Sequence, residues 1–198
     1  MKIFFQGDSI TDAGRDRSDN HLLKGYPLIV KNALSKENEI VNYAISGDTT
    51  KMMLDRHEEE FKKENPDILI MLIGINDVWR NVDKTPNQMY TTKESVENVT
   101  SVIEISKKIN PNIKVIVLEP YLLKGNASVA IHGFPLLNEM LKEYELNIKP
   151  LVDRYVYLQD EMTDLSNKGE ELTGDGVHPI ELGQAFLAKK VIEAIKSL

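Results

Sequence analysis

The chain has 198 residues, of which 41% are hydrophobic and 28% are charged, and its formal net charge is −7. These values predict one globular domain over residues 1–198, and no apolar run reaches the ~18 residues of a membrane span. The acidic charge argues against nucleic acid or an anionic membrane as a partner, because basic residues supply most of that affinity. The absence of cysteine excludes disulfides, thiolate metal sites and a cysteine nucleophile.

The amino terminus runs from Met1 and Lys2 directly into an apolar segment. No signal-peptide pattern precedes that segment, so we expect a cytoplasmic protein. The sequence leaves the oligomeric state open, with a homo-oligomer among the alternatives.

Five apolar segments alternate with longer amphipathic ones along the chain. Two of them, ILIMLI and KVIVL, are continuously hydrophobic, which is typical of strands covered by helices on both faces. The alternation predicts an α/β fold, namely a three-layer αβα sandwich with a five-stranded parallel sheet of the flavodoxin-like class. The predicted strands are Lys2–Gln6, Ile40–Ala44, Asp67–Ile73, Lys114–Glu119 and Tyr155–Leu158. The predicted helices are Tyr26–Ser35, Lys51–Lys63, Lys93–Lys108, Phe134–Lys149 and Ile180–Leu198, and Asp160–Asp175 is left unassigned.

Ser9 follows the first predicted strand, just after a bend at Gly7 and Asp8. Ligands of open α/β sheets bind at the carboxyl ends of the strands, so a hydroxyl on a tight bend there is placed to act as a nucleophile. Alternatively, Ser9 or Thr11 only caps the next helix, as Ser and Thr often do after a strand. The choice depends on whether other segments supply partners for Ser9.

Of the four histidines, only His178 has a carboxylate at a suggestive spacing. It follows Asp175 by three residues in a glycine-rich turn before the last helix. That spacing can bring a carboxylate to one imidazole nitrogen and leave the other facing a nucleophile. The alternative is a turn in which Asp and Pro serve only the backbone. We interpret His57, in DRHEEE, as part of a solvated helix face, and we place His21 and His132 in loops.

Two further polar turns follow the second and third predicted strands. Gly47 lies in SGDTT, which can also cap the following helix, and Asn76 lies in GIND directly after ILIMLI. The backbone N–H of Gly47, the side-chain amide of Asn76 and the N–H of Ser9 are candidate donors to an oxyanion. Each residue alone suits an ordinary turn equally well, but all three follow strands at the same sheet edge.

Together these motifs resemble the SGNH hydrolases, also called the GDSL esterase and lipase family. The resemblance rests on GDSIT at Gly7–Thr11, SGDT, GIND and DGVHP, which occur in the family's order over nearly the whole chain. It implies Ser9 as the nucleophile, His178 as the base and Asp175 as the residue that orients it. It also implies Gly47, Asn76 and the Ser9 amide as oxyanion donors, with no metal and no cofactor.

A narrower resemblance is carried by GINDVWR at Gly74–Arg80, together with Asp12, Gly14 and Arg15 after the Ser9 motif and with Tyr121–Asn126 after the fourth predicted strand. These residues resemble those of the family's intracellular carbohydrate acetylesterases, which implies a small-molecule ester substrate such as an acetylated oligosaccharide. The candidate substrate contacts are Asp8, Trp79 and Arg80. Trp79 can stack on a sugar ring or simply pack against the core. Arg15 and Arg80 can line the mouth of the site or pair with Asp residues, and Asp8 can also support the bend together with Thr11.

Two alternatives to an acetylesterase remain at this stage. A thioesterase or a short-chain lipase of the same family would use the same residues, because the acyl pocket cannot be shaped from the sequence. A non-enzymatic, flavodoxin-like binding protein would instead use Ser9, Thr11 and Gly14 as a phosphate loop. That last reading leaves His178 and Asn76 without a role.

Overall fold

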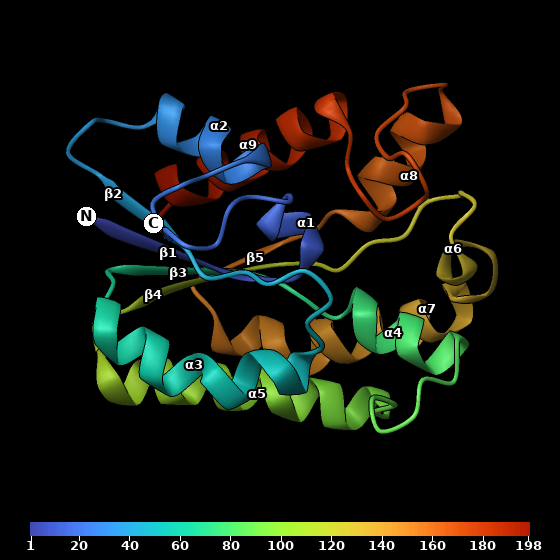
Figure 1. Cartoon of the computed structure of the whole chain (residues 1–198), viewed down its shortest axis with the longest axis horizontal. Helices are drawn as coiled ribbons and strands as arrows, with labels where there is room; N and C mark the ends of the chain where they lie inside the picture. Colours follow the sequence, from blue (N-terminus) through green and yellow to red (C-terminus); the bar gives the residue numbers. More distant parts are fainter.

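The computed structural model describes residues 1–198 and is built on a five-stranded parallel sheet in the order β2-β1-β3-β4-β5. Figure 1 shows helices on both faces of this sheet, which confirms the predicted three-layer α/β sandwich. Helices α2 (Gly25–Ala33) and α9 (Glu181–Lys196) cover one face, and α3 (Thr50–Glu64) and α5 (Thr92–Ile109) cover the other. The strands are β1 (Lys2–Gly7), β2 (Glu39–Asn42), β3 (Ile68–Leu72), β4 (Lys114–Leu118) and β5 (Arg154–Val156).

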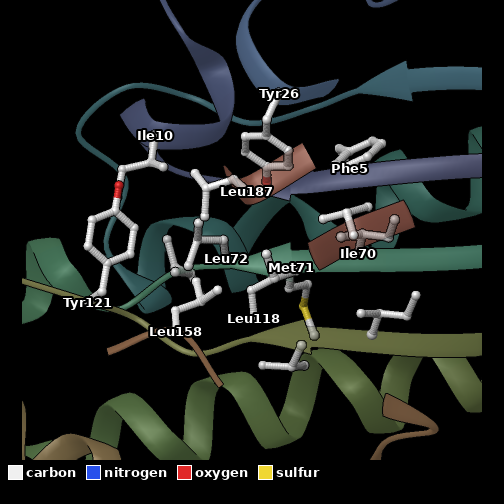
Figure 2. Close-up of a cluster of buried hydrophobic side chains, with 14 of the residues drawn as sticks. Phe5, Ile10, Tyr26, Ile70, Met71, Leu72, Leu118, Tyr121, Leu158 and Leu187 are labelled. Carbon is white, nitrogen blue, oxygen red and sulfur yellow. The ribbon is translucent and has the colours of Figure 1, made fainter. Parts of the chain in front are cut away.

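The central strands are buried because they carry apolar side chains toward both helical layers. Every residue of β3 is buried, and its Ile70 lies beside Phe5 of β1 in the parallel register. Figure 2 shows these side chains with Tyr26 and Leu187, contributed by α2 and α9. Full burial of such a side chain stabilises the fold by about 1.5–3 kcal/mol. No helix combines the length and the apolarity needed to cross a membrane.

Four short helices were not predicted, and all of them begin beyond the carboxyl ends of strands. They are too short to show an amphipathic period in the sequence. The first turn of α8, which lies at the start of the unassigned segment, is stabilised by a residue that is distant in the sequence. The backbone N–H groups of Leu158 and Gln159 both donate to the Glu119 carboxylate, at 2.7 and 2.8 Å. The four are α1 (Ser9–Asp12), α4 (Ile75–Val82), α6 (Ser128–His132) and α8 (Gln159–Asn167).

The predicted helix over residues 134–149 is in fact three segments. Helix α7 spans Phe134–Glu143, a π-helical turn spans Tyr144–Ile148, and a 3₁₀ turn spans Lys149–Leu151. Pro150 cannot continue an α-helix, because it lacks an N–H and its ring clashes with the preceding turn. The Tyr144 hydroxyl donates to the carbonyl of Ile73, at 3.1 Å, and anchors the π-helical turn to the end of β3.

The prediction that His57 lies on a solvated face was wrong. His57 has no exposed surface, and its ring nitrogens lie 2.7 Å from Gln6 Oε1 and 2.8 Å from Ser106 Oγ. Burial lowers the pKa of His57 to about 4. Met53, His57 and Phe61 are spaced four residues apart and are all buried, so they form the inner stripe of α3. The acidic neighbours concealed this stripe in the sequence.

Candidate active site

The turn that carries Ser9 is fixed by residues on both sides of it. A Cβ on Gly7 would lie 2.3 Å from the carbonyl oxygen of Leu72, so only glycine allows β1 to approach β3 this closely. The Asp8 carboxylate accepts the Ile10 N–H at 3.0 Å and caps α1, so the alternative in which Ser9 or Thr11 provides the cap is wrong. The Ser9 hydroxyl is therefore not needed as a cap.

Asp8 does not fit the predicted role of a substrate contact. It has no exposed surface, and its Oδ2 has no hydrogen-bond partner. Burial outweighs the hydrogen bond from Ile10 and raises the pKa of Asp8 to about 7, with a further contribution from repulsion by Asp48 and Asp77. Asp8 supports the bend from inside the protein, and Thr11 does so by a 2.8 Å hydrogen bond with the Tyr26 hydroxyl.

Ser9, His178 and Asp175 form a continuous hydrogen-bonded chain. Ser9 Oγ lies 2.9 Å from His178 Nε2, and His178 Nδ1 lies 2.7 Å from Asp175 Oδ2. Burial alone would raise the pKa of Asp175, but hydrogen bonds from the His178 ring and from two backbone N–H groups lower it below its ordinary value. An ionised carboxylate only accepts, so Nδ1 carries the proton and Nε2 is free to accept from Ser9.

The loop that carries Asp175 is anchored to the segment after β4. The Ala127 N–H donates to the Asp175 carbonyl at 3.2 Å, and the Tyr121 hydroxyl donates to the Val177 carbonyl at 2.9 Å. Gly125 allows the closest approach, because a Cβ there would lie 1.9 Å from the Asp175 carbonyl oxygen. Segments about 50 residues apart in the sequence therefore fix the position of the carboxylate.

Three N–H groups beyond the carboxyl ends of β1, β2 and β3 are the candidate oxyanion donors. The Ser9 N–H is at the first position of α1, where the helix itself offers no acceptor. The Gly47 N–H makes no hydrogen bond within the protein, and its φ of +91° favours glycine. Asn76 Nδ2 donates one hydrogen to the Asp48 carbonyl at 3.0 Å, which leaves its second hydrogen free.

Trp79 and Arg80 both lie beside this centre. The Trp79 ring is 6.1 Å from the His178 ring, measured between centroids, and its Nε1 donates to Ser128 Oγ at 2.9 Å. Ser128 in turn donates to Asp83, a link that nothing in the sequence indicated. Arg80 Nη2 donates to the Gly47 carbonyl at 3.4 Å. The indole is therefore held in place with its ring next to the imidazole.

The chain of three residues is open to solvent. The side chains of His178 and Asp175 are 45% and 29% exposed. No group of three or more His, Asp or Glu side chains converges as metal ligands would.

Comparison with known proteins shows the family of this chain. The model of the GDSL-like Lipase/Acylhydrolase family matches residues 5–186, so the chain belongs to this family. It is an ester-hydrolysing enzyme, and the resemblance inferred from the motifs is confirmed. The alternative of a flavodoxin-like binding protein is therefore set aside.

The chain is similar over nearly its whole length to two proteins named as esterases. It is 27% identical to an acetylxylan esterase from Geobacillus stearothermophilus, over 98% of this chain and 93% of the relative. It is 24% identical to an arylesterase from Vibrio mimicus, over 98% and 88%. Among solved structures, a protein described as a GDSL-like lipase from Parabacteroides merdae gives a TM-score of 0.88 at 27% identity, over 98% of this chain and 95% of that one. The structure of the Geobacillus enzyme gives a TM-score of 0.83, over 98% and 93%.

Proposed function

We propose that Ser9, His178 and Asp175 are the catalytic triad and that the enzyme removes short acyl groups, such as O-acetyl groups of carbohydrates. The observation that carries this proposal is the hydrogen-bonded chain from Ser9 Oγ through the imidazole to Asp175, at 2.9 and 2.7 Å. The first of these contacts joins residues 169 apart in the sequence, and no packing requirement explains a half-exposed imidazole in that position.

The first step forms an acyl-enzyme. As Ser9 Oγ attacks the ester carbonyl carbon, its proton passes to His178 Nε2, and Asp175 stabilises the resulting imidazolium. The N–H groups of Ser9, Gly47 and Asn76 stabilise the negative charge on the carbonyl oxygen. The tetrahedral intermediate then breaks its bond to the alcohol oxygen, which leaves with the proton from Nε2.

The second step releases the acid. Water gives a proton to Nε2 of His178 while its oxygen attacks the acyl carbon, and the same three donors stabilise the second oxyanion. Collapse of this intermediate breaks the bond to Ser9 Oγ, which takes back the proton from His178. The carboxylic acid leaves, and the enzyme returns to its starting state.

The relatives support both the triad and the acetyl substrate. The Geobacillus enzyme is an acetylxylan esterase, and catalytic mutants of it replace an aspartate, a histidine or a serine with alanine. Its aspartate precedes its histidine by three positions, as Asp175 precedes His178 in this chain. The fixed indole of Trp79 beside His178 offers an apolar face to a sugar ring.

Steady-state kinetics of variants test the triad. We expect Ser9→Ala or His178→Ala to lower kcat for p-nitrophenyl acetate by on the order of 10⁴–10⁶, and Asn76→Ala to lower it by roughly 10²–10³. His21→Ala is the matched histidine control, because His21 is exposed and lies outside the site. A Ser9→Ala variant that hydrolyses the ester at the parent rate would exclude the triad.

A substrate panel tests the acyl group and the leaving group separately. We expect kcat/KM to fall as the acyl chain is lengthened from acetyl on p-nitrophenol, and we expect acetylated xylo-oligosaccharides to be hydrolysed. Acyl-CoA and longer p-nitrophenyl esters represent the thioesterase and the short-chain lipase. Faster turnover of either, with no activity on the sugar acetates, would replace the acetylesterase proposal by that alternative.

A further inference from the structure

The α1 turn, which carries Ser9, also holds the segment that leads to Gly47. The Asn42 side-chain amide donates to the Thr11 carbonyl at 2.8 Å. Ser46 is bound by its backbone N–H and by its hydroxyl to the same carboxylate oxygen, Oδ2 of Asp12, at 3.2 and 2.5 Å. The last residue of α1 therefore contacts the residue directly before the candidate oxyanion donor.

The Asp12 carboxylate is buried and lies beside two arginine side chains. It is 2% exposed, and its Oδ1 lies 3.5 Å from Arg15 Nε. Arg15 is also buried and donates through Nη2 to the Ala44 carbonyl, at 3.4 Å. Arg17, whose side chain is half exposed, lies 3.7 Å from Asp12 Oδ2. The carboxylate is thus held by two cations while it accepts hydrogen bonds from the backbone N–H and the hydroxyl of Ser46.

We infer that Asp12 is a positioning residue that, through Ser46, aims the Gly47 N–H at the oxyanion. The inference rests on the proposed function. The Ser46 carbonyl carbon is bonded to the Gly47 nitrogen, so fixing the N–H and the hydroxyl of Ser46 restricts the rotation of the peptide group that carries the donor. Ser9 and Asp12 are the two ends of the same four-residue helix. The nucleophile and the donor therefore keep a fixed separation.

Helix α4 holds the other side of the same loop. Asn76 donates to the Asp48 carbonyl and Arg80 to the Gly47 carbonyl, at 3.0 and 3.4 Å. These contacts fix the peptide after Gly47, whereas the Asp12–Ser46 contact fixes the peptide before it. Loss of the Ser46 hydroxyl should therefore misalign one donor and leave the loop in place. Misplacing a group at the reacting centre by even 1 Å can cost up to about 10² in rate.

The test compares Ser46→Ala, Ser46→Thr and Asp12→Asn with a matched control, Ser101→Ala. The Ser101 hydroxyl donates to the Glu97 carbonyl at 2.9 Å on the outer side of α5, away from the site. We expect Ser46→Ala to lower kcat for p-nitrophenyl acetate roughly tenfold with KM nearly unchanged, because an oxyanion donor acts in the transition state. Ser46→Thr restores the hydroxyl and should restore kcat. Asp12→Asn should lower kcat in the same way, and Ser101→Ala should match the parent enzyme.

Two results would overturn the inference: a Ser46→Ala variant with the kcat of the parent, or a Ser46→Thr variant as slow as Ser46→Ala. If Asp12→Asn fails to fold, the comparison of Ser46→Ala with Ser46→Thr still tests the inference. Ser9→Ala, measured in parallel, separates the two proposals. An active Ser9→Ala variant removes the proposed function, whereas an inactive one together with a fully active Ser46→Ala variant removes only the role of Asp12.

Discussion

Replacing His57 by glutamine should remove part of the acid sensitivity of the fold. His57 is fully buried between Gln6 of β1 and Ser106 of α5. Burial lowers its pKa from the ordinary value of 6.5 to about 4. Between these pH values the unfolded chain binds a proton at this position and the folded chain does not. The stabilisation is therefore complete above pH 6.5 and is lost as the pH falls toward 4.

The size of the effect follows from the two pKa values of His57. Each pKa unit corresponds to about 1.4 kcal/mol, so a difference of about 2.5 units amounts to about 3 kcal/mol of unfolding free energy at pH 4. Glutamine is neutral throughout and contributes none of this dependence. The variant should be less stable than the parent at pH 7, because the two imidazole hydrogen bonds are lost.

Urea unfolding at pH values from 7 to 4 measures this prediction. The free energy of unfolding of His57→Gln, relative to the parent, should rise by about 3 kcal/mol over this range. Carboxyl groups that titrate in both proteins cancel in the difference. His21→Gln, at an exposed histidine, is the matched control and should show no such rise. Parallel curves for His57→Gln and the parent would refute the reasoning.

Three further substitutions test other parts of the structure. Burial raises the pKa of Asp8 to about 7, so the folded protein still holds a proton at pH values where the unfolded chain has released it. The parent therefore loses stability between pH 4 and pH 8, and Asp8→Asn does not. Relative to the parent, the free energy of unfolding of Asp8→Asn should rise by about 4 kcal/mol over this range, as measured by urea unfolding. Gly125→Ala should lower both Tm and kcat, because its methyl group would displace the Asp175 carbonyl; an unchanged kcat would contradict this. Tyr121→Phe should cost about 1–3 kcal/mol in chemical denaturation by leaving the Val177 carbonyl unpaired, and an unchanged midpoint would contradict this.

The sheet was predictable because its strands are continuously apolar and its helices are long enough to show a period. β3 and β4 are buried along nearly their whole length, and the five predicted strands overlap the observed ones. The placement of Ser9, Gly47 and Asn76 at one edge of the sheet was also predictable, because parallel strands end at the same edge. A local pattern was enough for each of these features.

Features that depend on distant contacts could not be predicted in this way. The start of α8 is held by Glu119, which lies 39 residues before Leu158, and the fixed orientation of Trp79 comes from Ser128. Asp8 was misassigned because an Asp beside a nucleophile looks accessible in a sequence, whereas the close packing of β1 against β3 buries it. The burial of His57 was missed for a local reason, because its acidic neighbours concealed the apolar stripe that it shares with Met53 and Phe61.

Covalent labelling of Ser9 tests the central claim most directly. The enzyme is incubated with a fluorophosphonate, digested, and analysed by mass spectrometry for the modified peptide. An activated nucleophile with its oxyanion donors in place should carry one adduct, on Ser9, formed as activity is lost, and His178→Ala should abolish the reaction. An inactivated enzyme with an unmodified Ser9, or with its adduct on another residue, would contradict the account.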